Sequence, residues 1–254
     1  MAVTLATGPA RPTGARWEFA GNPVAVGNPV RCHTHRMDTE DLRLAVYHHL
    51  AGTGRAPVNA ALAVVFDVEE DEIVAGLEVL DQERHLVLRD GRIVMAHPFA
   101  TIPLGFSVMG TDTLWWGGCA WDSFALPHLL SDEGEVLVAT TCPGCGAALS
   151  WVVGTEAPPA GDEVAHFLVP TAHLWDDVVH TCGHQRLFCS AACVDRWLTD
   201  SHNEQGYVMD LPTLWRLAAG WYAGRLDRDY VRREPEAAHA YFREVGLEGA
   251  FWGL

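Results

Sequence analysis

Apolar residues recur at four-residue spacing from residue 38 onward, which indicates amphipathic helices. Asp38 begins an acidic segment in which Leu42, Val46 and Leu50 fall on one face, so we expect a helix there. A short second helix is expected near residues 58–66, where the chain is almost wholly apolar.

A third helix is expected to start at Asp67, with Asp67 as its capping residue and Glu70 three positions later. Ile73, Leu77 and Leu80 would form its apolar face. Residues 85–89 and 92–95 then resemble two strands, and the Asp90-Gly91 pair between them predicts a type I′ hairpin turn. Three helices and a hairpin describe a winged-helix-like domain over residues 37–100.

Strand and helix patterns alternate in the second half of the chain, which predicts a mixed α+β core over residues 101–254. The expected strands are 106–109, 113–115, 135–139, 147–153 and 164–169, and the expected helices are 191–198 and 214–226. Residues 1–36 are rich in Pro, Gly and Ala without periodicity, so an irregular tail is expected there. The fold class is therefore α+β.

The charge balance excludes nucleic acid as a partner. The chain carries 17 basic and 33 acidic residues, a net charge of −16, and phosphate backbones would be repelled. The third helix is itself strongly acidic, so a structural or lid role is expected for the winged-helix-like part. The longest apolar run, 60–66, is too short to cross a bilayer, and residues 1–5 lack the features of a signal peptide. We therefore expect a cytoplasmic protein without a membrane partner.

Seven cysteines, an odd number, favour thiol or metal chemistry over a disulfide framework. Cys119 follows two glycines and precedes Asp122 by three residues, so a helix starting here would place thiol and carboxyl on one face. The helix dipole would favour the thiolate, while the thiolate and nearby tryptophans would raise the pKa of Asp122. The same spacing also fits a half-buried cysteine and an aspartate that only caps the helix.

Two segments together resemble the organomercurial (alkylmercury) lyase family. The first is Trp116-Gly-Gly-Cys-Ala-Trp-Asp-Ser123, and the second is His180-Thr-Cys-Gly-His-Gln-Arg-Leu-Phe-Cys-Ser190. The C-terminal run 214–254 is similar to the tail of actinobacterial members, and the resemblance covers roughly residues 38–254. It implies that Cys119 and Cys182 are the catalytic cysteines and that Asp122 is the catalytic aspartate.

The resemblance also implies the chemistry, protonolysis of R–Hg⁺ to RH and Hg²⁺ without an organic cofactor. Thiolates are the natural ligands of soft mercury, and Asp122 would supply the proton. Free thiols would help to release the ion, which Cys119 and Cys182 hold as product. The expected partners are a small organomercurial or related substrate, and a mercuric reductase or cellular thiols that take over Hg²⁺.

Four other cysteines depart from the family pattern. Cys142 and Cys145 form a Cys-x₂-Cys knuckle, and Cys189 and Cys193 a Cys-x₃-Cys pair at a helix start, which predicts a structural Zn²⁺ in a treble-clef or zinc-ribbon-like site of four cysteines. Reduced structural cysteines without metal are the alternative.

Four histidines and the seventh cysteine are further candidates. His180 and His184 flank Cys182 as polar neighbours expected to lower its pKa or to move protons, or else as ligands. Cys32, His33 and His35 form a small cluster in the tail that could hold a metal, but three such residues on an irregular segment are expected to bind nothing.

Two alternatives to the lyase hypothesis remain at this point. A protein of this fold could act on another organometal or substrate, or could be a thiol-rich metal-binding or sensor protein without turnover. Asp122 favours the enzyme, because a trap needs no acid beside its thiol. A winged-helix regulator is opposed by the acidic third helix.

Overall fold

Two antiparallel sheets carry the fold of the computed structural model, which describes residues 37–254. The predicted tail 1–36, with Cys32, His33 and His35, lies outside the described residues. The large sheet has the strand order β1-β2-β3-β5-β4-β6-β7, and the small sheet has the order β10-β8-β9. The strands are β1 (Val87–Arg89), β2 (Arg92–Ala96), β3 (Phe99–Ala100), β4 (Phe106–Met109), β5 (Leu114–Gly117), β6 (Glu135–Thr141), β7 (Ala148–Gly154), β8 (Val164–Phe167), β9 (Gln185–Phe188) and β10 (Tyr207–Asp210).

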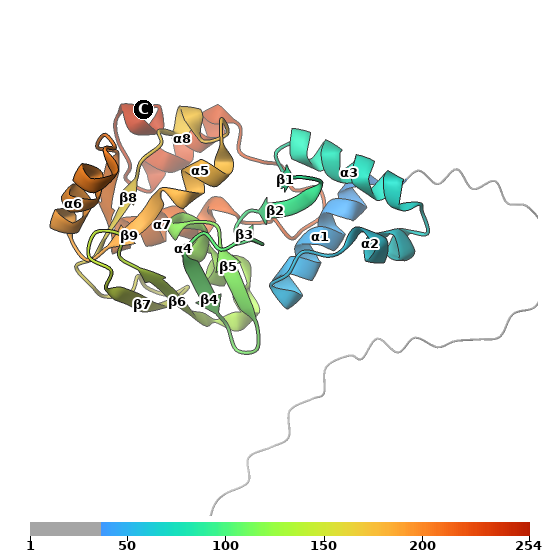
Figure 1. Ribbon diagram of the computed structural model, residues 1–254, viewed down its shortest axis with the longest axis horizontal. Helices are drawn as coiled ribbons and strands as arrows, with labels where there is room; N and C mark the ends of the chain where they lie inside the picture. Colours follow the sequence, from blue (N-terminus) through green and yellow to red (C-terminus); the bar gives the residue numbers. More distant parts are fainter. Residues whose placement is uncertain (1–36) are drawn as a thin grey trace, which may run out of the picture. The chain divides into compact units, whose positions relative to one another are not determined.

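Eight α-helices accompany the sheets within residues 37–254 (Figure 1). They are α1 (Thr39–Thr53), α2 (Asn59–Phe66), α3 (Glu70–Gln82), α4 (Ala120–Leu129), α5 (Val178–Gly183), α6 (Ala191–Ser201), α7 (Leu211–Trp221) and α8 (Pro235–Glu244). None of these helices has the length and apolar character that crossing a membrane requires. The predicted α+β class is confirmed.

The N-terminal helices follow the predicted pattern except at the start of α3. Asp38 caps α1 by accepting a hydrogen bond from the Glu40 backbone N–H at 3.0 Å, as its position predicted. Asp67 is not the cap of α3, and that prediction was wrong. It is the left-handed C-cap residue of α2, with φ 53°, and α3 begins at Glu70. The Val68 N–H bonds the Ala63 carbonyl, so Asp67 is used to end α2 before the chain can enter α3.

The hairpin of β1 and β2 has the predicted turn. Asp90 and Gly91 both have positive φ, 52° and 70°, as a type I′ turn requires. Strand β2 also pairs with β3, which pairs with β5, so the hairpin continues into the large sheet. The expected boundary at residue 100 falls at the end of β3, and the division into two domains stays a prediction.

Helix α4 lies at the centre of the core. It contacts α7 and strands β4, β5 and β6, and its residues 120–127 are all buried. Figure 1 shows it beside β4 and β5. A helix buried on every side holds its N-terminal residues in fixed positions, which matters for the cysteine that precedes it.

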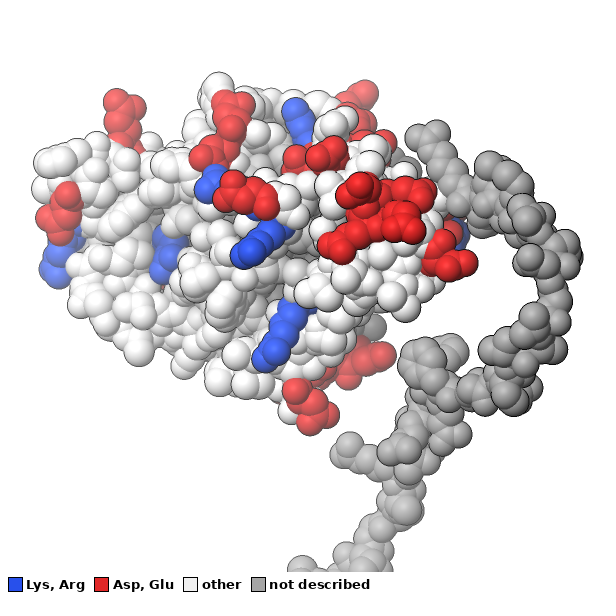
Figure 2. Space-filling model, turned by 45° about the vertical axis from the view of Figure 1, so that its right-hand side comes forward, with Lys and Arg blue, Asp and Glu red and all other residues white. Residues whose placement is uncertain are grey.

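Acidic side chains gather on the surface formed by the N-terminal helices (Figure 2). Glu69, Glu70, Asp71 and Glu72 at the start of α3 are all exposed. They complement the positive end of the helix dipole and give the helix an anionic surface that would repel a phosphate backbone.

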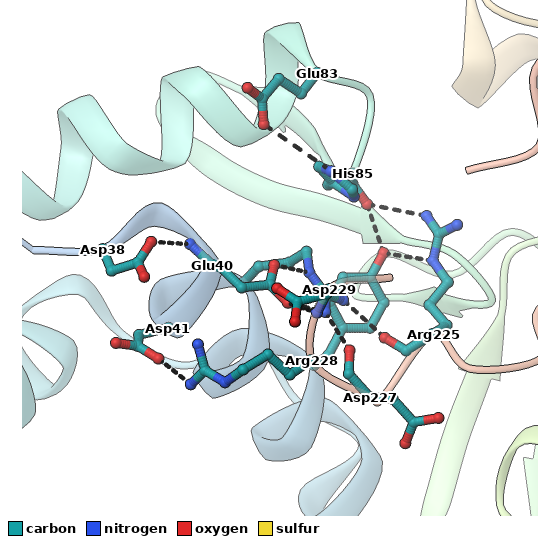
Figure 3. Close-up of polar contacts among 11 residues, drawn as sticks. Asp38, Glu40, Asp41, Glu83, His85, Arg225, Asp227, Arg228 and Asp229 are labelled. Carbon is teal, nitrogen blue, oxygen red and sulfur yellow. Dashed lines mark hydrogen bonds and ion pairs between the residues drawn. The ribbon is translucent and has the colours of Figure 1, made fainter. Parts of the chain in front are cut away.

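A polar network fastens α1 to the segment 225–229 (Figure 3). The fully buried Arg43 guanidinium donates to the carbonyl oxygens of Arg225 and Asp227, both at 2.7 Å, and pairs with Glu40 at 2.6 Å. Glu40 also accepts from the Asp229 backbone N–H at 2.8 Å. The C-terminal segment therefore has a fixed place against α1.

The first prediction concerns this network. Arg43→Met keeps much of the apolar stem but leaves two carbonyl oxygens and a carboxylate without their donor, so we expect a loss of about 3 kcal/mol in the free energy of unfolding. Urea denaturation measures it. Arg55→Met, at an exposed position, should change the free energy by less than about 0.5 kcal/mol. Equal midpoints for the two variants would show that the network contributes nothing.

Candidate active site

Cys119 occupies the turn between β5 and α4, as the sequence predicted. It is the extended N-cap residue of α4, and its Sγ accepts a hydrogen bond from the Asp122 backbone N–H at 3.4 Å. Gly118 permits this arrangement, because a Cβ there would lie 2.3 Å from Asp122 Oδ2. The glycine thus lets the carboxyl group fold back toward the sulfur.

Cys182 lies in the last turn of α5. Helix α5 starts at a cap in which Asp177 accepts from the His180 N–H at 3.0 Å, and β9 begins only at Gln185. The Cys182 Sγ lies 3.9 Å from Asp122 Oδ2. The fold therefore brings together the three residues that the sequence singled out, Cys119, Asp122 and Cys182.

Asp122 is a buried carboxyl group held by a tyrosine. It is 1% exposed, and the Tyr222 hydroxyl donates to its Oδ1. Burial raises the pKa of Asp122 from 3.8 to about 7, although the hydrogen bonds from Tyr222 and the two cysteines act in the opposite direction. The expected rise is present, with burial as its main cause.

The two thiols do not behave as the helix dipole alone predicts. Burial raises the pKa of Cys119 well above its usual value, and the hydrogen bond that it donates to Cys182 adds to the rise. That hydrogen bond lowers the pKa of Cys182, but burial and the Asp122 charge outweigh it, so this pKa is raised as well. A free thiolate at Cys119 was the wrong expectation, because desolvation exceeds the effect of the dipole. Of the two, Cys182 is the sulfur that the pair favours as thiolate.

His97 is a site residue that sequence reasoning missed. It lies between β2 and β3, is 7% exposed, and its Nε2 is 3.6 Å from Cys182 Sγ. Burial, then the charges of Arg225 and Arg232, lower the pKa of His97 to about 3, so its ring is neutral at neutral pH. Ligand atoms of His97, Asp122 and Cys182 all lie within 4.8 Å of one another. The only sequence signal was a histidine beside a proline after a strand.

The rings of His180 and His184 have neighbours other than Cys182. Their rings contact each other at 4.1 Å between centroids, and His184 also contacts Trp197. The imidazole beside Cys182 is that of His97.

A cavity of about 110 Å³ opens beside the thiols. Cys119, Asp122, Cys182 and Tyr222 form its buried end. Its half-exposed lining includes Trp175, Trp221, Arg232 and Arg233. Cavities of roughly 150 Å³ hold benzene, so this space suits a small organic group next to the two sulfurs.

The other predicted cysteine group also comes together. The Sγ atoms of Cys142, Cys145, Cys189 and Cys193 lie within 4.8 Å of one another, and that of Cys145 is 3.5 Å from that of Cys189. In a tetrahedral zinc site with bonds near 2.3 Å, sulfurs are about 3.8 Å apart. Gly144 lies against the Cys193 backbone, where a Cβ would come within 2.1 Å of the carbonyl oxygen. The knuckle and the start of α6 thus pack in direct contact.

Comparison with known proteins identifies the class of this site. Residues 99–223 match the family model described as alkylmercury lyase. The structure titled "Crystal structure of the mercury-bound form of MerB2" matches with a TM-score of 0.54, covering 74% of this chain and 97% of that chain at 18% identity, which shows a common fold. No curated protein matches the chain. Residues 99–223 are therefore a carbon–mercury lyase domain. The chain thus contains an alkylmercury lyase domain, and it is an organomercurial lyase-like enzyme.

The second prediction follows from the raised pKa of Asp122. The unfolded carboxyl loses its proton near pH 4, whereas the folded one keeps it to about pH 7, so folding stability falls as pH rises between these values. Asp122→Asn removes this loss, and the stability of the variant relative to wild type should increase by about 4 kcal/mol between pH 4 and pH 8.

Urea denaturation at a series of pH values measures the difference. Asp200→Asn, at an exposed carboxyl on α6, should follow the wild-type pH dependence. A pH-independent difference between Asp122→Asn and wild type would mean that Asp122 titrates normally.

Proposed function

We propose that this chain cleaves the carbon–mercury bond by protonolysis, with Cys119 and Cys182 as mercury ligands and Asp122 as the proton donor. One observation carries the assignment. A buried carboxyl group whose pKa is about 7 lies on the first turn after one thiol and 3.9 Å from the other. Soft ligands and a general acid thus share one dry cavity.

Substrate capture starts at Cys182. The incoming mercury carries an organic group R and a solution thiolate, and the Cys182 thiolate displaces that thiolate from the metal. The displaced thiolate takes the proton of Cys119, whose sulfur then adds to the mercury and pushes electron density onto the carbon bound to it. Both sulfurs are buried, so water does not compete for the metal.

Asp122 completes the reaction. Its carboxyl proton moves to the carbon, the C–Hg electron pair becomes the new C–H bond, and RH leaves while Hg²⁺ stays on the two sulfurs. The Tyr222 hydroxyl occupies Oδ1, so Oδ2 is the oxygen that carries the proton toward the thiols. Two thiols from solution take the ion and leave their two protons on Cys119 and Asp122, while Cys182 is again a thiolate. The chain itself supplies the ligands and the acid, so the reaction needs no organic cofactor.

Tyr222 and His97 act as positioning residues in this scheme. Tyr222 fixes the carboxyl orientation by its hydrogen bond to Asp122. His97 places a neutral nitrogen 3.6 Å from Cys182 Sγ, where it can donate to the thiolate or approach the mercury.

Structural zinc is the second part of the proposal. Cys142, Cys145, Cys189 and Cys193 supply four sulfurs, the donor set of closed zinc sites. We assign the knuckle at Pro143-Gly144 and the start of α6 to a treble-clef or zinc-ribbon-like site, as their cysteine spacing predicts. Zinc here would fix the end of β9, the strand that directly follows Cys182.

The winged-helix-like part, residues 37–100, acts in our proposal as a cover for the catalytic core of residues 101–254. The contacts of Arg43 with the segment 225–227 support this role, since they hold that segment beside the cavity.

A role in mercury resistance and detoxification follows from the proposed reaction. In a cytoplasmic setting the released Hg²⁺ would pass to cellular thiols or to a mercuric reductase. The charge of −16 argues against nucleic acid as a further partner.

The third prediction tests the acid. Asp122→Asn should still bind a phenylmercury compound through both sulfurs but release benzene about 10²- to 10⁴-fold more slowly, because the amide cannot transfer a proton. Cys182→Ser should lose both stable mercury binding and turnover, since oxygen is a poor ligand for mercury. Benzene release with excess thiol and intact-protein mass spectrometry measure the two properties.

Matched controls make the outcome clear. Asp200→Asn should retain wild-type turnover, and wild-type protein with one equivalent of substrate should carry bare mercury. If wild type keeps the phenyl group indefinitely, the protein is a metal-binding trap. A wild-type rate for Cys182→Ser would remove that residue from the mechanism.

The fourth prediction tests the zinc site. Purified protein should contain about one zinc per chain, and Cys193→Ser should lose the metal and unfold at lower urea concentration. Cys119→Ser should keep the zinc. Elemental analysis that finds no zinc in protein prepared without chelator would leave these four residues as reduced structural cysteines.

A further inference from the structure

Positive charge gathers at the opening of the catalytic cavity, although the chain as a whole is acidic. Arg225, Arg232 and Arg233 all line the cavity that contains the thiols. Arg225 is buried, whereas Arg232 and Arg233 are half-exposed and therefore lie toward solvent. In a chain of net charge −16, three arginines in one cavity need a reason.

Two of these arginines already have protein partners. Arg225 donates to the hydroxyls of Tyr47 and Tyr230, each at 3.0 Å. Arg233 donates to the Gly220 carbonyl at 3.0 Å and lies 4.6 Å from the Tyr241 ring centroid. Both contacts hold the cavity wall in place.

Arg232 differs from both. Within residues 37–254, no hydrogen bond or ion pair joins its guanidinium to another side chain or carbonyl. It lies 5.3 Å from the centroid of the Trp175 ring, which also contacts Arg84 at 5.6 Å. Its five N–H donors are thus oriented by stacking on tryptophan and left for a ligand.

The effect of the two positive charges beside Arg232 exceeds that of its acidic neighbour. Burial, then the charges of Arg84 and Arg225, lower the pKa of Arg232, and Glu234 is the acidic side chain that acts in the opposite direction. The positive charges of Arg225 and Arg232 reach inward as well, since both lower the pKa of His97. An anion at the opening would relieve this repulsion.

We propose that Arg232, stacked on Trp175 at the opening, binds an anionic group of the incoming organomercury complex, a carboxylate either on the organic group or on the thiol that carries the mercury. This inference rests on the proposed function and names its substrate class. A guanidinium matches a carboxylate with two parallel hydrogen bonds, and the tryptophans give an apolar wall for the rest of the complex. The group would bind at the opening while the mercury reaches the sulfurs at the buried end.

The test uses three substrate complexes with the full-length protein. The first is phenylmercury with the neutral thiol 2-mercaptoethanol, the second is 4-carboxyphenylmercury with the same thiol, and the third is phenylmercury with 3-mercaptopropionate. Each is measured for kcat and KM with wild type, Arg232→Gln, Arg232→Lys and the control Arg243→Gln, an exposed arginine on α8.

We expect wild type to show a lower KM for the second or the third complex than for the first, by about tenfold. The arm that improves identifies the carrier of the carboxylate. Arg232→Gln should abolish this preference, so that KM no longer differs among the three complexes, Arg232→Lys should keep part of it, and Arg243→Gln should keep all of it. The preference should also shrink at high salt.

Equal KM values for all three complexes with wild type, or a preference that survives Arg232→Gln, would overturn the inference. The first complex carries no anion, so its turnover tests the lyase reaction alone. Should it fail, binding of the three complexes to wild type and to Arg232→Gln, measured by competition, still decides whether Arg232 recognises the anionic group.

Discussion

The rest of the site depends on the contacts that the buried Arg225 guanidinium makes with its neighbours. A lone charge in a protein interior costs several kcal/mol, and Arg225 offsets that cost without a carboxylate partner among the hydrogen bonds of residues 37–254. The Tyr47 and Tyr230 hydroxyls and the His85 carbonyl accept its N–H groups, and three tyrosine rings lie 5.0 to 5.4 Å from it. Contacts of this cation–π type contribute about 0.5 to 2 kcal/mol each.

These partners come from separate parts of the chain. Tyr47 belongs to α1, His85 precedes the hairpin, and Tyr222, whose ring lies at 5.3 Å, donates a hydrogen bond to the Asp122 carboxyl. One cation therefore joins the N-terminal helices to the proposed proton donor. Its charge also disfavours protonated His97 and favours ionised Asp122, so it influences both groups that face Cys182.

Desolvation determines the protonation of the remaining groups. It raises the pKa of Cys119 and of Asp122, although hydrogen bonds lower that of Asp122. The resting site thus disfavours anions. Mercury changes this balance, because Hg²⁺ bound by two thiolates is a neutral assembly that a dry cavity accommodates at little cost. Burial makes the free thiols weak acids, because it disfavours their charged form. The complex of two thiolates with Hg²⁺ carries no net charge, so burial does not oppose it.

Features that depend on neighbouring residues could be predicted from the sequence. The hairpin turn at Asp90-Gly91 and the placement of Cys119 and Asp122 on one turn both follow from short-range spacing. The grouping of four cysteines was predictable for a related reason, since two close pairs need only one long-range contact to meet. The short helix that contains Cys182 was not predicted, because six residues give too little periodicity to detect a helix.

Features that depend on long-range packing could not be predicted in this way. Tyr222 meets Asp122 across 100 positions and His97 meets Cys182 across 85, with no motif to link them. The sign of the Cys119 pKa shift could not be predicted for the same reason, because burial is a property of the whole fold.

Arg186 on β9 illustrates how such packing joins the two cysteine groups. It donates to the Leu104 carbonyl at 2.8 Å, and the charges of both Cys119 and Cys142 act on it. The strand β9, which separates Cys182 from Cys189, thus carries a cation that responds to Cys119 and Cys142. A metal that fixed one end of β9 would also fix the distance between Arg186 and the sulfurs proposed as catalytic.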